Sequence, residues 1–119
     1  MAAGPTARTL QELRRQRCIA QVVERWNPHA HVRQDLFGFA DIIALDPTTG
    51  ITAIQCTTGD HHANRREKVL AEPRALAWLR AGGSIQVRSW SKIGPRGCRK
   101  VWTERIEAIG FSQFNGKAA

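Results

Sequence analysis

The sequence is poor in acidic residues, in cysteine and in long apolar stretches, and each scarcity excludes a class of protein. No apolar run approaches the roughly 18 residues that a membrane-spanning helix needs, and the N-terminus has no apolar block typical of a secretory signal. The three cysteines are odd in number and widely spaced, which excludes a disulfide framework and a paired-cysteine zinc site. We therefore expect a cytoplasmic protein with no membrane partner.

Basic residues are in clear excess. The chain of 119 residues has 18 Lys plus Arg against 10 Asp plus Glu, a formal net charge of +8, and an isoelectric point near 10.7. Such a bias favours a polyanionic partner, and guanidinium groups, which outnumber ammonium groups here, suit phosphate recognition. The alternative is a basic surface without a dedicated ligand. We expect DNA, duplex or branched, as the partner.

The length fits one domain, and the sequence has no internal repeat and no low-complexity linker. A content of 42% hydrophobic and 24% charged residues is ordinary for a globular protein. Both termini are small and polar. We predict a single domain over residues 9–110, with flexible ends at residues 1–8 and 111–119.

The first half of the chain predicts a helix followed by three strands. Thr9 and Glu12 are spaced as in a capping box, apolar residues then recur at three- and four-residue steps, and Pro28 prevents continuation. Turn residues between two β-branched segments predict an antiparallel hairpin. The expected elements are a helix over residues 9–26 and strands over residues 31–36, 39–45 and 51–57.

The second half predicts a long helix and a second hairpin. The helix follows Asp60, is kinked or split at Pro73 and stops at Gly82. Alternating strands at residues 85–90 and 100–106 are joined by a loop rich in Gly and Pro. The whole order predicts an α/β fold with a mixed central sheet flanked by helices.

Asp41 is the most conspicuous acidic residue, because it lies in an apolar strand just after Gly38. A buried carboxylate is costly unless it is paired, hydrogen-bonded or bound to a cation. The predicted hairpin brings Gln55 next to it, and Glu24, on the inner side of the first helix, is a third candidate ligand. Oxygen ligands of this kind suit Mg²⁺ or Mn²⁺. Asp35 is either a further acidic ligand or an arginine partner.

Structural alternatives exist for each of these residues. Asp41 could pair with Arg33 or cap backbone amides, Glu24 could be solvated, and Gln55 could be a hydrogen-bonded amide at a strand end. The adjacent His61 and His62 could bind a metal or transfer a proton, but neighbouring residues diverge on a helix, which favours a place in its first turn.

The order helix, three-stranded meander, helix, strand resembles the core of the PD-(D/E)XK nuclease superfamily, which includes Holliday-junction-resolvase-like and restriction-endonuclease-like enzymes. The resemblance covers residues 12–90. It is carried by Trp26-Asn27-Pro28, the run from Arg33 to Asp41, the run from Gln55 to Gly59, Arg66-Glu67-Lys68 and Trp78-Leu79. More specifically, these segments are similar to small phage and mobile-element proteins that are described as nuclease-like or resolvase-like.

The resemblance implies a restriction-endonuclease-like fold and a metal-dependent endonuclease with Asp41 as the first acid and Glu24 as the helical acid. The triplet D/E-x-K of the family is replaced by Gln55-Cys56-Thr57, so the motif is D…QxT. Lys68 or Arg65 on the following helix would then supply the missing cation. If neither does, the chain is a nuclease-fold protein that binds DNA without cutting it, such as an accessory or inhibitory factor.

Basic residues in the last third, interleaved with Trp90 and Trp102, predict a surface that contacts phosphates. The alternative places the two tryptophans as a cross-strand pair in the core. A homodimer is plausible, because cutting two strands requires two sites. The expected nucleic-acid-binding residues are Arg33, Arg65, Arg66, Arg88, Lys92, Arg96, Arg99 and Lys100; the expected catalytic residues are Asp41, Gln55, Glu24 and Lys68; the expected metal ligands are Asp41, Gln55, Glu24 and Asp35.

Overall fold

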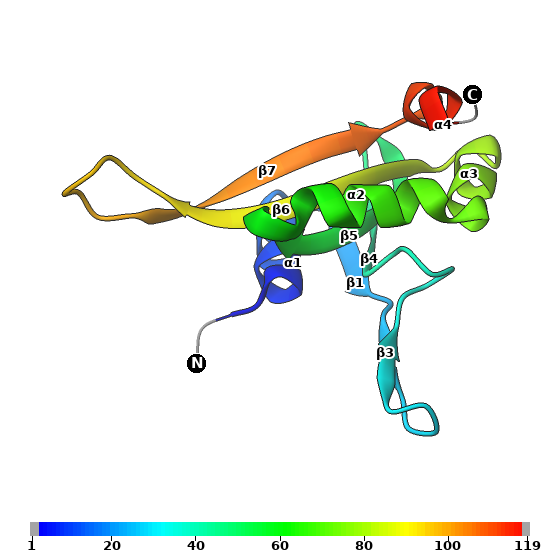
Figure 1. Cartoon of the computed structure of the whole chain (residues 1–119), viewed down its shortest axis with the longest axis horizontal. Helices are drawn as coiled ribbons and strands as arrows, with labels where there is room; N and C mark the ends of the chain where they lie inside the picture. The colour runs from blue at the N-terminus through cyan, green and yellow to red at the C-terminus, as the bar shows by residue number, and fades with distance from the viewer. Residues whose placement is uncertain (1–2, 118–119) are drawn as a thin grey trace.

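Figure 1 shows a computed structural model of the chain, in which residues 3–117 are described and side chains are described up to residue 114. Residues 1–2 and 118–119, which belong to the ends expected to be flexible, lie outside the described residues. The elements in chain order are α1 (Pro5–Arg15), β1 (Ile19–Val22), β2 (Arg25–Asn27), β3 (Val32–Gln34), β4 (Ile42–Asp46), β5 (Gly50–Thr58), the 3₁₀ turn η1 (Gly59–His61), α2 (His62–Ala71), α3 (Pro73–Arg80), β6 (Ser84–Ile93), β7 (Val101–Ile109) and α4 (Phe111–Lys117).

The central sheet has five strands in the order β1-β4-β5-β6-β7. β1, β4 and β5 form an antiparallel meander, β6 lies parallel to β5, and β7 is antiparallel to β6. A crossover between parallel strands needs a long connection, which α2 and α3 supply. The structure thus confirms the predicted α/β class with a mixed sheet flanked by helices.

Each face of the sheet buries its own apolar cluster, as strict strand alternation requires. On one face α1 packs over the meander, where Leu13 contacts a cluster that contains Ile42, Ile54 and Cys56. On the other face α2, α3 and α4 cover a cluster built on β5, β6 and the end of β7. Figure 1 shows α1 and the α2–α3 pair on different sides of the strands.

The predicted first helix over residues 9–26 is wrong at both ends. α1 begins at Pro5, whose missing N–H suits the first helical turn, and the Thr9 hydroxyl donates to the Pro5 carbonyl instead of capping. The helix ends because Arg17 adopts a φ of 64°, and its N–H bonds the Arg14 carbonyl while Cys18 N–H bonds that of Leu13. This is a Schellman-type ending with arginine in the place that glycine usually occupies.

The first strand of the meander is therefore β1, not the predicted strand at residues 31–36. That segment forms β3, which pairs with β2 in a separate two-stranded sheet. In Figure 1 this β2–β3 hairpin extends away from the central sheet. The strand predicted over residues 39–45 begins at Ile42, so Asp41 immediately precedes β4.

The second half of the chain confirms the prediction. Pro73 splits the long helix into α2 and α3, and Gly82, with a φ of 100°, follows the end of α3. β6 and β7 form the second hairpin. The ends expected to be flexible carry helical residues, since α1 includes Pro5 to Arg8 and α4 begins at Phe111.

Candidate functional site

Asp41 lies where the three strands of the meander meet. Its N–H donates to the Ile54 carbonyl at 2.9 Å, and its own carbonyl accepts from Val23 N–H at 2.8 Å. The pairing of Ile42 with Ile54, continued by one step, places Asp41 opposite Gln55. The side chain is 3% exposed, and its Oδ2 accepts a hydrogen bond from Cys56 N–H at 2.8 Å. The hairpin geometry predicted from the 14-residue spacing is thus confirmed.

Asp35 is brought to Asp41 by a tight loop between them. Phe37 and Gly38 both have positive φ, 54° and 78°, and Phe39 N–H donates to the Leu36 carbonyl, as in a type I′ turn. Leu36 and Ala40 form a β-bridge that closes the loop. The acids that precede and follow this small hairpin therefore lie side by side.

Glu24 contributes the third carboxylate from a different element than predicted. It lies between β1 and β2, not on the first helix. Its N–H, at 3.4 Å, approaches the same Asp41 carbonyl that accepts from Val23 N–H, which fixes the backbone beside Asp41. The Arg33 guanidinium lies 3.8 Å from its carboxylate. Arg33 thus pairs with Glu24 and not with Asp41 or Asp35.

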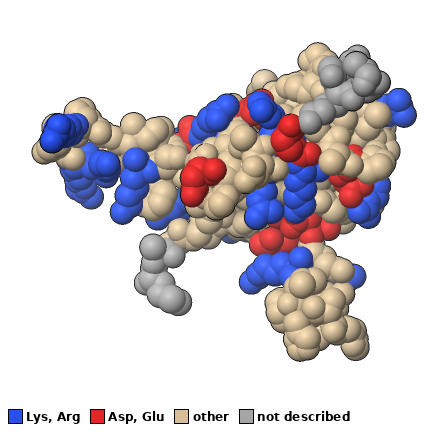
Figure 2. Space-filling view, in the orientation of Figure 1, with Lys and Arg blue, Asp and Glu red and all other residues tan. Residues whose placement is uncertain are grey.

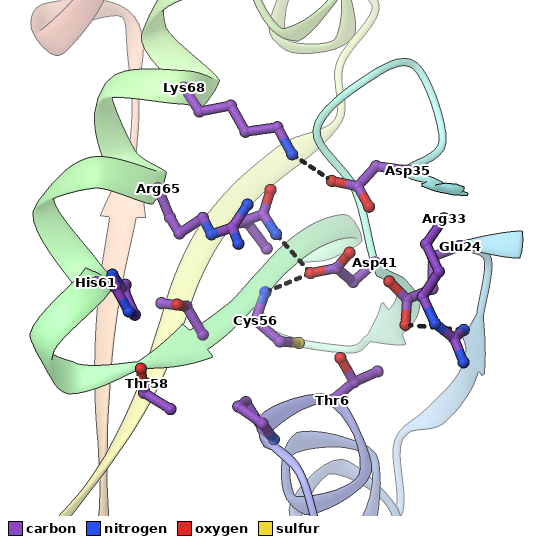
Figure 3. A pocket seen from close by; sticks show the side chains of 13 residues that line it. Thr6, Glu24, Arg33, Asp35, Asp41, Cys56, Thr58, His61, Arg65 and Lys68 are labelled. Carbon is purple, nitrogen blue, oxygen red and sulfur yellow. Dashed lines mark hydrogen bonds and ion pairs between the residues drawn. The ribbon is translucent and has the colours of Figure 1, made fainter. Parts of the chain in front are cut away.

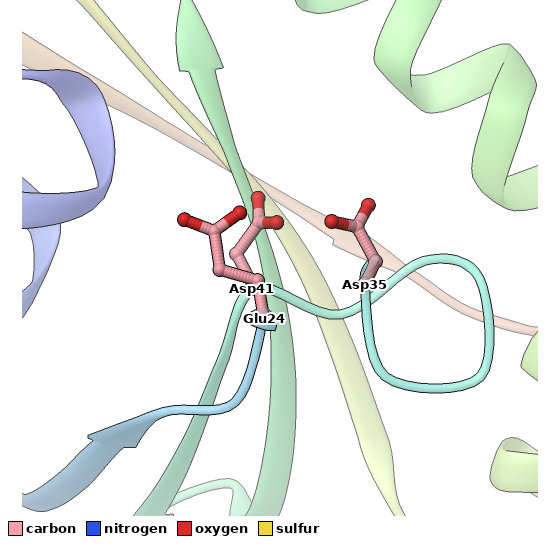
Figure 4. A group of neighbouring side chains, drawn as sticks. All are labelled: Glu24, Asp35 and Asp41. Atoms are coloured by element: carbon pink, nitrogen blue, oxygen red, sulfur yellow. The ribbon is translucent and has the colours of Figure 1, made fainter. Parts of the chain in front are cut away.

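The three carboxylates converge as Figure 4 shows, with one oxygen of each of Glu24, Asp35 and Asp41 within 4.8 Å of the others. Burial raises the pKa of Asp41 to about 8, helped by a hydrogen bond with Asp35 and by the negative charge of Asp35 and Glu24, against the lowering effect of Cys56 N–H. Packing like charges together in a buried place is unfavourable unless a proton or a cation is bound between them.

The side chain of Gln55 also indicates that a cation or a donor binds beside Asp41. Its Nε2 donates to Asp41 Oδ2 at 2.5 Å, so the amide holds the carboxylate in place. Its Oε1 is buried, and no described residue donates to it; among the described side chains it is the buried polar atom without a partner. An unsatisfied buried acceptor costs about 1–3 kcal/mol, which a donor or cation would recover.

These groups line a cavity of about 430 Å³ whose other wall is basic. Figure 3 shows Lys68 and Arg65 extending from α2 into it, with Lys68 Nζ 2.7 Å from Asp35 Oδ2. Arg65 has no acidic partner among the described residues. His61 and Thr58 also line the cavity. An anion that enters would meet Arg65 beside the carboxylate cluster.

The donor set fits a hard divalent cation. Neighbouring oxygen ligands of an octahedral Mg²⁺, each about 2.1 Å from it, are about 3 Å apart, so carboxylate oxygens that lie within 4.8 Å of one another would draw together by up to about 2 Å to bind it. A hard cation prefers these oxygens to sulfur, and burial raises the pKa of the Cys56 thiol to about 12. Thr57, at the position where the sequence resemblance led us to look for a lysine, is buried and uncharged.

Of the two adjacent histidines only His61 lines the cavity. The His62 side chain is 2% exposed; its Nδ1 lies 2.6 Å from Ser89 Oγ and its Nε2 lies 2.8 Å from Glu107 Oε1. Arg66, predicted to contact nucleic acid, also pairs with Glu107, at 3.4 Å. This network fixes the start of α2 to the sheet, and so fixes the helix that carries Arg65 and Lys68.

The prediction that Arg88 contacts nucleic acid is wrong. It is 3% exposed, its Nε donates to Gln86 Oε1, and its guanidinium pairs with Glu104 at 3.3 Å. A buried, paired arginine in this position cannot contact phosphate. The tryptophans do not form the cross-strand pair considered above, since Trp90 donates to Thr9 Oγ1 and Trp102 is 37% exposed.

The remaining predicted cations lie on an extension of the second hairpin. We call residues 92–102 the arm; it continues β6 and β7 beyond the rest of the sheet, and Figure 2 shows Lys and Arg side chains gathered on it. The exposed cations of the arm are Lys92, Arg96, Arg99 and Lys100.

Two cavity-lining residues at the start of α1, Pro5 and Thr6, were missed by sequence reasoning. A proline followed by a helical pattern marks a helix start, and this signal would have placed the start of α1 at Pro5. No helix within residues 3–117 is long and apolar enough to cross a membrane.

No protein-family model, curated protein or solved structure matches the chain.

Proposed function

We propose that the chain is a Mg²⁺- or Mn²⁺-dependent endonuclease that hydrolyses phosphodiester bonds of DNA, of the resolvase-like kind found in the PD-(D/E)XK superfamily. One observation carries the proposal: three carboxylates lie within 4.8 Å of one another, beside the buried, unpartnered Oε1 of Gln55. The topology of a meander followed by a parallel strand supports the same superfamily.

Glu24, Asp35 and Asp41 would hold the cation, and Gln55 would orient Asp41 and offer its carbonyl oxygen. A bound divalent cation supplies polarisation of a phosphoryl oxygen and lowers the pKa of a bound water. Arg65, which has no acidic partner among the described residues, would bind the scissile phosphate and stabilise its developing charge. Lys68 holds Asp35 in place through their contact at 2.7 Å.

The test is cleavage of branched, duplex and single-stranded DNA by the purified chain in Mg²⁺, in Mn²⁺ and in EDTA. We expect cleavage only with metal, and a loss of at least about 100-fold in Asp41→Asn, more than is usually lost when a residue that only supports a metal ligand is changed. Asp46→Asn is the matched control. It removes the same charge about 17 Å along β4 by strand rise, and asparagine can keep the turn bonds to Thr48 and Thr49.

Two results would overturn the proposed site. One is metal-dependent cleavage that Asp41→Asn leaves unchanged, and the other is equal loss in Asp41→Asn and Asp46→Asn. A calorimetric titration with Mn²⁺ measures metal binding at the site independently of cleavage. Binding by the wild type and not by Asp41→Asn is the expected result.

A second candidate function is binding of DNA without cleavage, as in an accessory or inhibitory protein. It is favoured by the neutral Thr57 in place of the family lysine and by the pairing of Lys68 with Asp35. DNA binding that depends on salt, with Mn²⁺ bound and no cleavage of any substrate, would support this alternative.

We place the protein in the cytoplasm, encoded by a phage or mobile element, in line with the resemblance that the sequence shows. We also propose a homodimer, because two sites are needed to cut both strands of a duplex or junction. Sedimentation of the protein with and without a branched substrate measures the oligomeric state directly.

A further inference from the structure

The arm leaves the sheet at the same end as the metal site. β5 and β6 run parallel with Thr58 paired to Trp90, so both strands point toward the edge where the cavity opens. β5 ends there, whereas β6 continues through Ile93 and returns as β7 from Val101. By strand rise the arm extends about 15 Å beyond the last pair shared with β5.

The arm consists of the paired ends of β6 and β7 and the turn that connects them. The β6–β7 ladder continues to the pair Ile93 and Val101, and Cys98 N–H closes a turn on the Pro95 carbonyl, with Gly97 at a φ of 82°. Gly94 allows the two strands to meet, because a Cβ there would lie 2.8 Å from the Arg99 carbonyl oxygen. Arg96, Arg99 and Lys100 thus lie in the short connection of residues 94–100, at the end of the paired ribbon.

Contacts at the base hold the arm against α1. The Arg8 guanidinium lies 4.0 Å from the ring centroid of Trp102, and Lys92 Nζ lies 5.3 Å from the same ring. Such cation–π contacts stabilise the ribbon near the site wall that α1 forms.

The charge of the arm differs from that of the rest of the surface. No acidic residue occurs in the sequence between Glu72 and Glu104, and within the described part of the chain no ion pair involves the four arm cations. Elsewhere Arg15, Arg33, Lys68 and Arg74 each pair with a carboxylate, whereas Arg14, Arg17 and Arg80 are exposed without an ion pair among the described residues but lie apart from the arm. Unpaired, exposed cations at the end of this hairpin are available to an external polyanion.

Ile93 and Val101 add an apolar component to this surface. They are 58% and 61% exposed and directly paired, on the ribbon face opposite the paired Lys92 and Trp102. A two-stranded ribbon fits the B-DNA major groove, about 12 Å wide, where thymine methyl groups offer apolar contact. The deep, narrow major groove of duplex RNA excludes such a ribbon.

We propose that the arm binds duplex DNA in the major groove next to the metal site, with Arg96, Arg99 and Lys100 on the phosphates. The inference rests on the proposed function in taking DNA as the substrate. Because the binding is measured in EDTA, it can fail while metal-dependent cleavage stands, and it can hold when cleavage is absent.

The experiment measures the affinity for a labelled 20-base-pair duplex by anisotropy in EDTA over a range of salt concentrations. For the variant R96Q/R99Q/K100Q we expect a loss on the order of 100-fold at 0.1 M salt and a log–log salt slope smaller by about 2.7. The matched control R14Q/R17N/R80Q also lowers the net charge by three, on exposed residues outside the arm, and asparagine suits the left-handed backbone at Arg17. It should retain most of the affinity and slope.

Cys98 gives a second readout at the tip of the arm, because it is exposed whereas Cys18 and Cys56 are buried. Saturating duplex should slow its alkylation about tenfold in wild type at low salt, and high salt should restore the rate. Three results would overturn the proposal: equal losses in the two triple variants, Cys98 alkylation unchanged by bound duplex, or equal competition by an RNA duplex of the same sequence.

Discussion

The metal site and the arm differ in the sign and in the exposure of their charged residues. The site gathers Glu24, Asp35 and Asp41 in a cavity, partly or fully removed from solvent, where they repel one another. The arm spreads cations over an exposed ribbon. Like charges in the buried site cost free energy that a bound cation would recover, whereas the exposed cations are screened by water and cost little. Changes in the site should therefore alter stability and metal binding strongly, and changes in the arm should alter mainly association with a partner.

The largest expected effect is on stability. The folded chain holds the Asp41 proton up to a pKa of about 8, far above that of an unfolded aspartate, so the folded state binds more protons between about pH 4 and pH 8. Asp41 therefore lowers stability as pH rises through that window. We expect Asp41→Asn to raise the unfolding free energy by about 5 kcal/mol at pH 8 in EDTA, and by progressively less toward pH 4. Urea unfolding at several pH values measures this.

The matched control for that measurement is Asp46→Asn, which should leave the pH dependence of wild type unchanged. A variant Asp41→Asn that is less stable than wild type at pH 8 would contradict the view that the acids of this cavity repel one another.

The next effect concerns metal affinity. A cation must displace the proton that Asp41 holds below pH 8, so Mn²⁺ affinity should fall about tenfold per pH unit, or about 100-fold between pH 8 and pH 6. Calorimetry in buffers of different ionisation enthalpy would count the released protons. Equal affinity at pH 6 and pH 8 would show that Asp41 is not a ligand.

A smaller effect is expected at Gly38, whose positive φ closes the loop between Asp35 and Asp41. A Cβ there would contact the Glu72 carboxylate and lie 2.7 Å from an Arg74 guanidinium nitrogen. We expect Gly38→Ala to lower the unfolding free energy by about 1–2 kcal/mol and to weaken Mn²⁺ binding by displacing Asp35. Gly50→Ala, with a φ of 80° and no atom near the added Cβ, separates the two effects. Equal Mn²⁺ affinity in the two variants would contradict a positioning role for this loop.

The smallest effect is expected at the base of the arm. Arg8→Gln removes the cation over Trp102, an exposed contact worth about 0.5–1 kcal/mol. Amide hydrogen exchange should quicken a few fold in residues 92–102 and nowhere in the carboxylate site. Arg14→Gln, which changes an exposed arginine of the same helix that is not over a ring, should leave the arm amides unaffected.

Much of the sheet was predictable because its signals are local. The turn at Asp46 to Gly50 fixed one hairpin, and alternation fixed strands β4 to β7 to within a few residues. Pro73 marked the break between α2 and α3. Once that first hairpin was assigned, the proximity of Asp41 and Gln55 followed from counting residues.

The segment from Gln16 to Asn27 was not predictable by the same means. Ala20 and Val22 fit a helical stripe as well as one face of a strand, and the residue that ends α1, Arg17, carries no glycine signal. Glu24 was therefore assigned to the wrong element, the first helix, although its predicted position close to Asp41 was right. Arg88 was misassigned because its partner, Glu104, lies diagonally across the β6–β7 ladder and becomes a neighbour only when the strands pair.

Asp41 joins two requirements in one residue. Its main chain bonds to the strands on both sides, while its carboxylate belongs to the candidate metal site. Asparagine can replace it with the same shape, so a population of variants selected only for folding should keep Asp or Asn there. Selection for the chemistry should accept aspartate alone. The arm has no such double constraint at a single residue, because Gly94 and the turn serve its shape whereas Arg96, Arg99 and Lys100 supply its charge.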